Sequence, residues 1–136
     1  MAEPLIVDAN PIISALLGGA ARDVIFSGDF TFYSAQHTLF EVEKYIPVMA
    51  KKLGCAELVL LREFELLPII ACQPSEFDSH LEKANRLISQ RDPKDVQILA
   101  LTLKLGYPLW TEDRDFEDIE DISLCRTVDL IRQESS

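Results

Sequence analysis

Carboxylate side chains recur in this sequence where expected strands end and where expected helices begin. Asp8 directly follows the first apolar run of the chain, and Asp113 follows a later one. Glu41 and Asp95 each fall in the first turn of an expected helix. In a parallel α/β sheet, strand ends and the starts of adjoining helices lie along one edge. We therefore expect these carboxylates to meet in space although they are far apart in the sequence.

Such a group of carboxylates needs a partner of opposite charge. Two carboxylates about 4 Å apart repel each other by about 4 kcal/mol at an effective dielectric constant of 20. The group is stable only if some members are protonated or a cation lies among them. The chain has 2 histidines and 3 cysteines without a Cys-x-x-Cys pair, so oxygen ligands for Mg²⁺ or Mn²⁺ are expected. Such an ion can activate water, which predicts hydrolysis of a phosphate ester.

Each acid taken alone also has a purely structural explanation. Asp8 could end a strand in a turn, and Asp113 could be an ordinary loop acid. Glu41 could be solvated or favour the positive end of its helix, and Asp92 and Asp95 resemble a capping pair. The joint placement favours a metal site, because structural acids have no reason to gather at one sheet edge.

The order of expected elements indicates how these residues are positioned. Strands are expected at residues 5–7, 30–34, 69–71, 109–111 and 122–125. Helices are expected at 11–17 with Asn10 as cap, 20–26, 37–46, 49–53, 56–66, 76 to about 90 with Ser75 as cap, 93–105 and 128–132. Alternating strands and helices with long crossovers predict a parallel sheet with helices on both faces. The apolar helix that ends before Gly106 should be mostly buried.

Size and composition limit the class of protein. The 136 residues are expected to form one domain, residues 1–136. The start of the sequence lacks the pattern of a signal peptide, and no apolar run approaches the length of a membrane span. The odd number of cysteines fits reduced thiols. A cytoplasmic protein without membrane contact is therefore expected. The net charge of −10, taken alone, argues against nucleic-acid binding.

Four motifs, in their order and spacing, resemble the successive motifs of PIN-domain ribonucleases. They are Leu5-Ile-Val-Asp8-Ala-Asn10, Thr38-Leu-Phe-Glu41-Val, Asp92-Pro-Lys-Asp95 and Leu109-Trp-Thr111-Glu-Asp113-Arg-Asp115-Phe116. The similarity runs from the first expected strand to the last. The resemblance implies a three-layer α/β/α sandwich with a central parallel sheet. It also implies that the protein cleaves RNA with Mg²⁺ or Mn²⁺.

The resemblance implies roles for individual residues. The acidic quartet that holds the metal is matched by Asp8, Glu41, Asp95 and Asp113. Asn10 matches the small polar residue that braces the first acid, and Thr111 matches the hydroxyl residue beside the fourth. Further ligands or outer supporting groups are expected at Asp92 and Asp115. The cations expected to help this acidic chain bind RNA are Arg114, Lys94, Lys51 and Lys52.

A single domain of this length is similar to the VapC-type toxins of prokaryotic toxin–antitoxin pairs. That similarity implies a homodimer held silent by a small antitoxin, and the apolar helices from Tyr45 to Leu67 are the expected dimer surface. Many such toxins carry Arg-Asn and a later Asp after the residue that Thr111 matches, whereas this chain has Glu-Asp-Arg-Asp. A related branch has a Thr-x-Asp-x-Asp-Phe form. The sequence therefore leaves the toxin role and the RNA target open.

Three other functions compete with a ribonuclease. The first is a PIN-like binding or regulatory module without catalysis, whose sign would be a missing acid, and none of the four is missing. The second is a haloacid-dehalogenase-like phosphatase, which needs Asp-x-Asp after the first strand, where Asn10 takes the second position. The third is a phospho-acceptor receiver domain, which needs paired acids near the N-terminus. A P-loop nucleotide hydrolase is excluded because the Gly-x-x-x-x-Gly-Lys pattern is absent.

Overall fold

A parallel sheet of five strands forms the centre of the molecule. The structure is a computed structural model that describes residues 2–88 and 92–135, with side chains described through residue 131. The strands are β1 (Glu3–Val7), β2 (Phe30–Ala35), β3 (Ile69–Cys72), β4 (Leu109–Trp110) and β5 (Leu124–Cys125). Their order is β3-β2-β1-β4-β5, and every pair is parallel. The chain moves outward from β1 to β3 and then crosses back to β4, so the direction of winding switches between β1 and β4.

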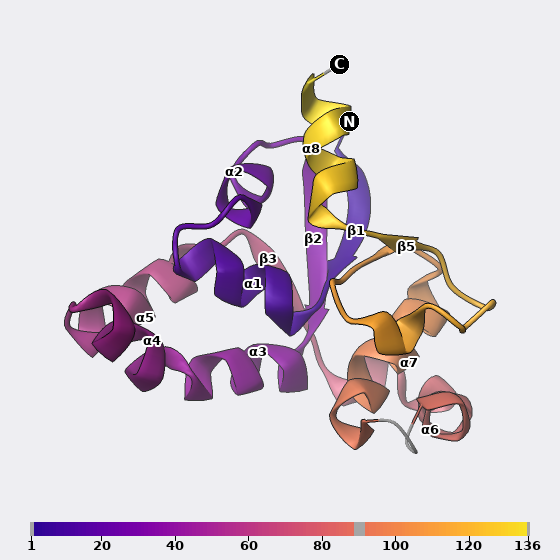
Figure 1. Cartoon of the computed structure of the whole chain (residues 1–136). Helices are drawn as coiled ribbons and strands as arrows, with labels where there is room; N and C mark the ends of the chain where they lie inside the picture. Colours follow the sequence, from indigo (N-terminus) through magenta and orange to yellow (C-terminus); the bar gives the residue numbers. More distant parts are fainter. Residues whose placement is uncertain (1, 89–91, 136) are drawn as a thin grey trace.

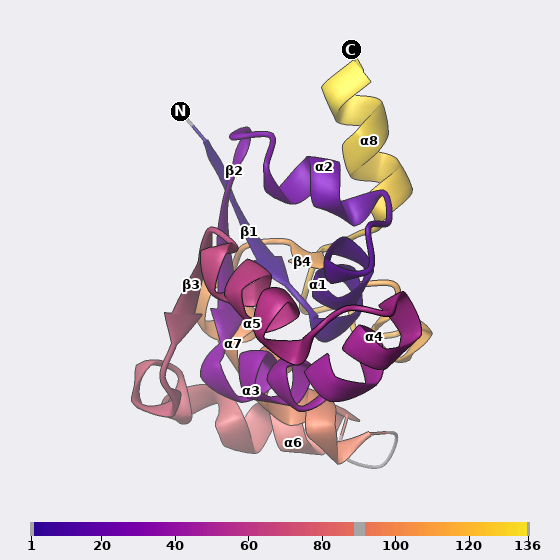
Figure 2. The same ribbon diagram turned by 90° about the vertical axis from the view of Figure 1, so that its left-hand side faces the viewer.

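Helices cover both faces of this sheet (Figures 1 and 2). They are α1 (Ala9–Leu16), α2 (Ala21–Ile25), α3 (Gln36–Lys44), α4 (Ile46–Leu53), α5 (Glu57–Leu66), α6 (Leu81–Ile88), α7 (Val96–Leu105) and α8 (Thr127–Ser135). Short 3₁₀ turns occur at Pro74–Glu76, Asp78–His80, Pro93–Asp95 and Arg114–Phe116. Within the described part of the chain, no helix has the length and apolar character needed to cross a membrane.

Two hydrophobic cores lie on opposite sides of the sheet because successive strand side chains point to opposite faces. Leu5 and Val7 of β1 pack in the core formed with α1, α2, α4, α5 and α8. Ile6, between them, packs in the core formed with α6 and α7. Strands buried on both faces read as continuous apolar runs, as here. The expected three-layer α/β/α sandwich is confirmed.

The first helix begins earlier than the sequence suggested. Helix α1 starts at Ala9, and its cap is Asp8, whose side chain accepts a hydrogen bond from the Ala9 amide; the prediction that Asn10 caps a helix from Pro11 was wrong. Proline is tolerated in the first helical turn, because the amide that it lacks would have no intrahelical partner there. Consequently Asp8 belongs to both the strand end and the helix start.

The helix expected from Glu76 to about Gln90 also differs. Two 3₁₀ turns occupy its first part, and α6 begins at Leu81, so Ser75 is not a helix cap. The Glu76 carboxylate accepts from the Gln73 amide at 2.6 Å and closes a tight turn instead. The expected end near Gln90 lies outside the described residues.

Candidate metal centre

A cleft of about 230 Å³ opens at the carboxyl ends of β1 and β4, where the winding of the sheet reverses. Open α/β sheets bind ligands at such a switch point. The lining residues are Asp8, Ala9, Asn10, Ile13, Thr38, Glu41, Tyr45, Asp92, Lys94, Asp95 and Asp113. Five of these eleven residues are acidic and one is a lysine, so the cleft is strongly anionic.

Asp8 is buried at the base of the cleft, with 5% of its surface exposed. Its Oδ1 accepts from the Ala9 amide at 2.8 Å, and its Oδ2 accepts from the Thr111 hydroxyl at 2.8 Å. Burial raises the pKa of Asp8 and the charges of Asp113 and Asp92 add to the increase, while the two hydrogen bonds act in the opposite direction. The carboxylate is thus held in one orientation but is costly to ionise without a cation.

Thr111 connects the first and the last of the predicted acids. Its hydroxyl donates to Asp8 Oδ2 and accepts from the Asp113 amide at 3.0 Å. The residue is 3% exposed, so water competes little for these bonds. The sequence placed Thr111 beside Asp113 alone, and its bond to Asp8 is an addition from the structure.

Asp95 lies in the 3₁₀ turn that precedes α7 and projects into the cleft. Burial, followed by the charges of Asp8, Asp92 and Asp113, raises the pKa of Asp95 to about 8. Its Oδ2 is buried and has no hydrogen-bond partner among the described residues. An unpartnered buried carboxylate oxygen surrounded by other carboxylates fits a divalent cation, which would satisfy the oxygen and offset the repulsion.

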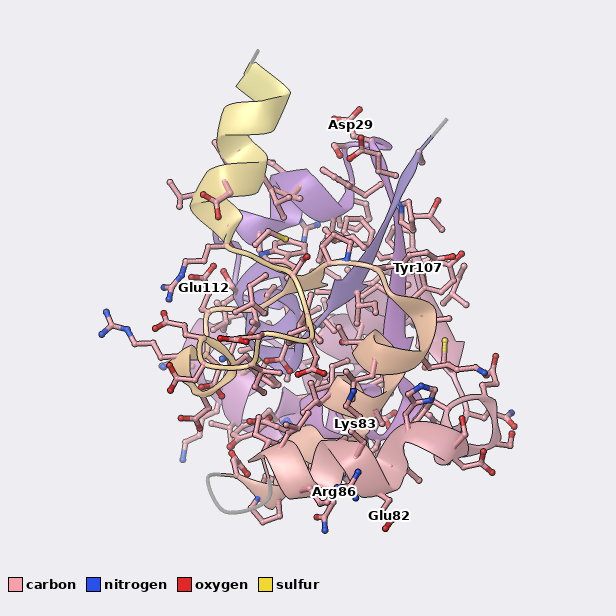
Figure 3. The ribbon with its side chains drawn as sticks, turned by 90° about the vertical axis from the view of Figure 1, so that its right-hand side faces the viewer. Asp29, Glu82, Lys83, Arg86, Tyr107 and Glu112 are labelled. Atoms are coloured by element: carbon pink, nitrogen blue, oxygen red, sulfur yellow. The ribbon has the colours of Figure 1, made fainter. Side chains whose placement is uncertain are left out.

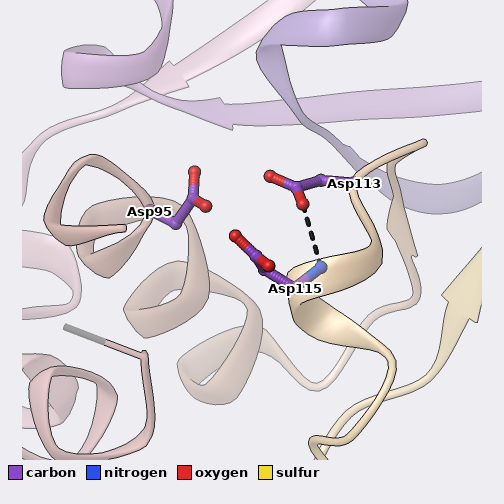
Figure 4. A group of neighbouring side chains, drawn as sticks. All are labelled: Asp95, Asp113 and Asp115. Carbon is purple, nitrogen blue, oxygen red and sulfur yellow. Dashed lines mark hydrogen bonds between the residues drawn. The ribbon is translucent and has the colours of Figure 1, made fainter. Parts of the chain in front are cut away.

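Asp115, expected as a further ligand or an outer supporting group, lies close to Asp95 and Asp113. Ligand oxygens of Asp95, Asp113 and Asp115 all lie within 4.8 Å of one another (Figure 4). Asp113 Oδ1 accepts from the Asp115 amide at 2.9 Å, which fixes the turn that carries both side chains. Hard oxygen donors of this kind are typical ligands of divalent cations.

Glu41 approaches the cleft from α3, at its rim. Its Oε1 is 3.3 Å from the Lys44 amine and 3.8 Å from His37 Nε2. Among the described residues, Asp95, Asp113 and Asp115 form a triad able to share one ion. Glu41 lies outside this triad, in the lining of the same cleft as Asp95 and Asp113.

The remaining predicted residues divide between the cleft and the outer surface. Asn10 lines the cleft, but its side chain is exposed, and Asp8 is braced by Ala9 and Thr111 instead. Asp92 and Lys94 also line the cleft, and Asp92 accepts from the Lys94 amide at 3.0 Å.

Three of the predicted cations lie outside the lining of the cleft. Arg114 is exposed on the turn between Asp113 and Asp115. Lys51 and Lys52 are exposed in the last turn of α4, on the arm of α4 and α5 that extends away from β4 and α7 (Figure 1). The fold therefore does not bring these two lysines to the centre of the cleft.

Thr38 and Tyr45 line the cleft but were not predicted as site residues. Thr38 is 5% exposed and lies one turn before Glu41 on α3. Residues three or four apart share a helix face, so the spacing of Thr38, Glu41 and Tyr45 was the signal that could have identified them.

Comparison with known proteins gives one family and several related folds. A family profile described as PIN domain matches residues 6–123. VapBC2 from Rickettsia felis, bound to a DNA fragment from its promoter, has a TM-score of 0.70 and 13% identity over 90% of this chain and 98% of that chain. A toxin–antitoxin complex from Klebsiella pneumoniae has a TM-score of 0.62 and 20% identity over 87% and 94%. VapC20 of Mycobacterium tuberculosis, a toxin that cleaves the sarcin–ricin loop, has a TM-score of 0.58 and 16% identity over 85% and 95%. A search of curated proteins found no match.

Proposed function

Because the chain belongs to the PIN-domain family over residues 6–123, we propose that it is a metal-dependent endoribonuclease. The observation that carries the proposal is the meeting of Asp8, Asp95 and Asp113, from three separate segments, in one cleft with an unpartnered buried carboxylate oxygen. A related fold, VapC20, cleaves the sarcin–ricin loop, which supports RNA as the substrate.

The acids of the cleft would hold Mg²⁺ or Mn²⁺. When bound, the ion supplies an activated water and offsets negative charge on the phosphate. Asp95, Asp113 and Asp115 offer oxygens close enough to share an ion, and Asp8 and Glu41 complete the anionic wall. The Ala9 amide and the Thr111 hydroxyl keep the Asp8 carboxylate from rotating as the substrate binds. Such fixed donors reduce the reorganisation needed during the reaction.

The substrate must approach an acidic surface. Lys94 lines the cleft and would contact a phosphate next to the cleaved bond, and Arg114 is exposed between Asp113 and Asp115. The chain carries a net charge of −10, so we propose that RNA binding depends on the divalent ion as well as on these side chains.

We also propose that the protein is the toxin of a toxin–antitoxin pair. The related Klebsiella structure is a toxin–antitoxin complex, which supports a small antitoxin partner. An apolar groove of about 450 Å³ between α4 and α5 offers a surface for a second copy or for that partner. Its lining is Glu43, Ile46, Pro47, Glu57, Leu58 and Leu61. The three cysteines are free thiols, which fits activity in the reducing cytoplasm.

The direct test is cleavage of RNA with Mg²⁺ or Mn²⁺. We expect Asp8→Asn and Asp95→Asn to reduce the rate by about a hundredfold or more, since loss of outer groups alone costs metal sites about 10–100-fold. Asp29→Asn is the matched control, because Asp29 precedes β2 at the opposite edge of the sheet (Figure 3). Equal rates in all four proteins would refute the site, and calorimetry without Mn²⁺ binding would favour the non-catalytic module.

A further inference from the structure

A second hollow, of about 310 Å³, lies on the same edge of the sheet as the metal centre. Its lining residues are Gln36, His37, Phe40, Pro74 and Gln97. Gln36 directly follows β2 and Pro74 closely follows β3, so this hollow lies beyond the carboxyl ends of those two strands. The metal cleft lies beyond the ends of β1 and β4, the adjoining half of that edge.

The two hollows share a wall formed by α3. On α3, Thr38 and Glu41 line the metal cleft, whereas His37 and Phe40 line the second hollow. His37 Nε2 lies 3.8 Å from Glu41 Oε1, which joins the two linings directly. A strand whose phosphate lies in the cleft could therefore place a neighbouring unit in the second hollow.

The lining of the second hollow has the groups that recognise a nucleobase. The Phe40 ring is 52% exposed, and the Lys44 amine lies 4.7 Å from its centre, so the ring offers a stacking surface with a cation nearby. The amides of Gln36 and Gln97 can both donate to and accept from base edges.

Gln97 carries an unsatisfied polar atom that the fold does not explain. Its Oε1 is buried and has no hydrogen-bond partner in the described part of the chain. A buried polar atom without a partner is costly, and in a folded protein it calls for a reason. If the Gln97 side chain turns its amide toward the hollow, a base edge bound there supplies the missing donor.

We propose that this hollow binds the base of a nucleotide next to the cleaved phosphate of single-stranded RNA. The proposal rests on the proposed ribonuclease function and adds a specificity subsite to it. Phe40 stacks on the base, and Gln97 reads its edge. The amides make the hollow too polar for an apolar peptide side chain. The Lys44 amine and the His37 ring beside the hollow already contact Glu41, which disfavours a bare phosphate ion.

Phe26 provides a closely matched control for Phe40. Its ring is 50% exposed, and the Arg22 guanidinium lies 5.3 Å from its centre, so both phenylalanines are half-exposed rings beside a cation. Phe26 is the C-cap of α2, close to the turn that precedes β2, and it lines neither hollow. A difference between Phe40→Leu and Phe26→Leu therefore reports the position of the ring rather than its chemistry.

The test measures kcat and KM with Mn²⁺ on short single-stranded RNA oligonucleotides. We expect Phe40→Leu to raise KM on the order of tenfold, the typical cost of losing one base stack, with kcat little changed. Phe26→Leu should match the wild type. A series of oligonucleotides carries one abasic nucleotide, placed at a different position in each. At one position the abasic nucleotide should raise the KM of the wild type. At that position it should leave the KM of Phe40→Leu, which is already raised, unchanged.

Gln97→Leu separates recognition from folding. Removing an unpartnered buried oxygen should leave the melting temperature unchanged or higher. The wild type should prefer particular bases at the position that the abasic series identifies, and Gln97→Leu should reduce that preference. A lower melting temperature with an unchanged base preference would show that Gln97 is structural.

The outcomes distinguish the subsite from the ribonuclease activity. If the wild type cleaves RNA and Phe40→Leu behaves like Phe26→Leu, the subsite is refuted and the nuclease stands. If the wild type does not cleave, the nuclease is refuted, and fluorescence anisotropy with the same oligonucleotides decides the subsite. Binding weakened by Phe40→Leu alone would support it, and equal or absent binding would refute it.

Discussion

Asp95 and Asp8 meet the cost of burial in different ways. Asp8 has a hydrogen bond on each carboxylate oxygen, whereas Asp95 Oδ2 has no partner among the described residues. Burial and the neighbouring acids raise the pKa of Asp95 to about 8, so near neutral pH this side chain holds a proton when no cation is bound. A divalent ion would replace that proton, and metal binding is therefore coupled to pH.

This coupling predicts how stability changes with pH. The carboxyl of Asp95 has a pKa of about 8 in the folded protein and 3.8 as its ordinary value, so between these values the folded state holds more protons than the unfolded state. Stability without metal should then fall as pH rises from about 4 to about 8. The stabilisation by Mn²⁺ should grow over the same range. Thermal melting at several pH values, with and without Mn²⁺, measures both trends.

Substitution isolates the contribution of Asp95 to this behaviour. Asp95→Asn should flatten the fall in stability and reduce the gain from Mn²⁺, leaving the smaller trend due to Asp8, whose pKa is raised as well. Asp29→Asn should keep the wild-type profile. A wild-type melting temperature that rises from pH 4 to 8 without metal would contradict the assignment.

At the scale of elements, the start of α8 is tied to the segment that carries Asp113. Glu112 accepts a hydrogen bond from the Thr127 amide at 2.7 Å, and the Trp110 indole donates to the Thr127 hydroxyl at 3.0 Å. A carboxylate at a helix N-terminus satisfies a free amide and favours the positive end of the helix dipole. The final helix thereby helps to hold the loop that carries Asp113 beside the acidic cleft.

We expect Glu112→Ala to lower the free energy of unfolding by about 1 kcal/mol, the usual cost of losing a helix cap. It should also weaken Mn²⁺ binding, because the neighbouring Asp113 is held less firmly. Glu112→Gln keeps an acceptor for the Thr127 amide and should recover most of both losses. Denaturant unfolding and calorimetry provide the measurements.

Glu117→Ala is the control for the charge of this region. Glu117 and Glu112 both contact the Arg126 guanidinium, Glu112 at 3.9 Å. The Thr127 amide donates its hydrogen bond to Glu112. If Glu117→Ala weakens Mn²⁺ binding as much as Glu112→Ala does, the negative charge of this region, and not the helix cap, supports Mn²⁺ binding.

Local signals in the sequence predicted some elements well because local chemistry decides them. Gly106 ends α7 with a left-handed φ of 71°, as a glycine after an apolar helix suggests. The helical spacing after Ser75 was misleading, because Phe77 adopts a φ of −139° and its side chain is fully buried between the two 3₁₀ turns. Tertiary burial of one ring overrides the local preference for a helix there.

The same distinction applies to the site. Asp8 and Asp113 could be placed from sequence because each follows a strand, and parallel topology brings strand ends to one edge. The bond from Thr111 to Asp8, across 103 residues, and the closeness of Asp115 to Asp95 depend on side-chain orientation, which no local pattern determines.

At the scale of the whole molecule, several large apolar side chains of α4 and α5 are exposed. Half or more of the surface of Val48, Leu58, Val59 and Leu66 is exposed, and the apolar groove of about 450 Å³ lies between these helices. An apolar groove with exposed apolar side chains on its two helices is a candidate interaction site. Since the arm projects from the sandwich, as Figure 1 shows, a partner could cover it without blocking the metal cleft at the switch point.

We expect the protein to sediment as a dimer at micromolar concentration, with this groove in the interface. Leu58→Arg should shift it toward monomer, because a stable interface of about 800 Å² per partner does not tolerate an unpaired charge at an apolar position. Val128→Arg is the matched control, since Val128 is 49% exposed on α8, a different element. RNA cleavage per chain should survive Leu58→Arg, because Leu58 does not line the cleft. If the wild type sediments only as a monomer, the dimer is refuted and an antitoxin is the remaining partner for the groove. If Val128→Arg dissociates the dimer and Leu58→Arg does not, the interface lies on α8.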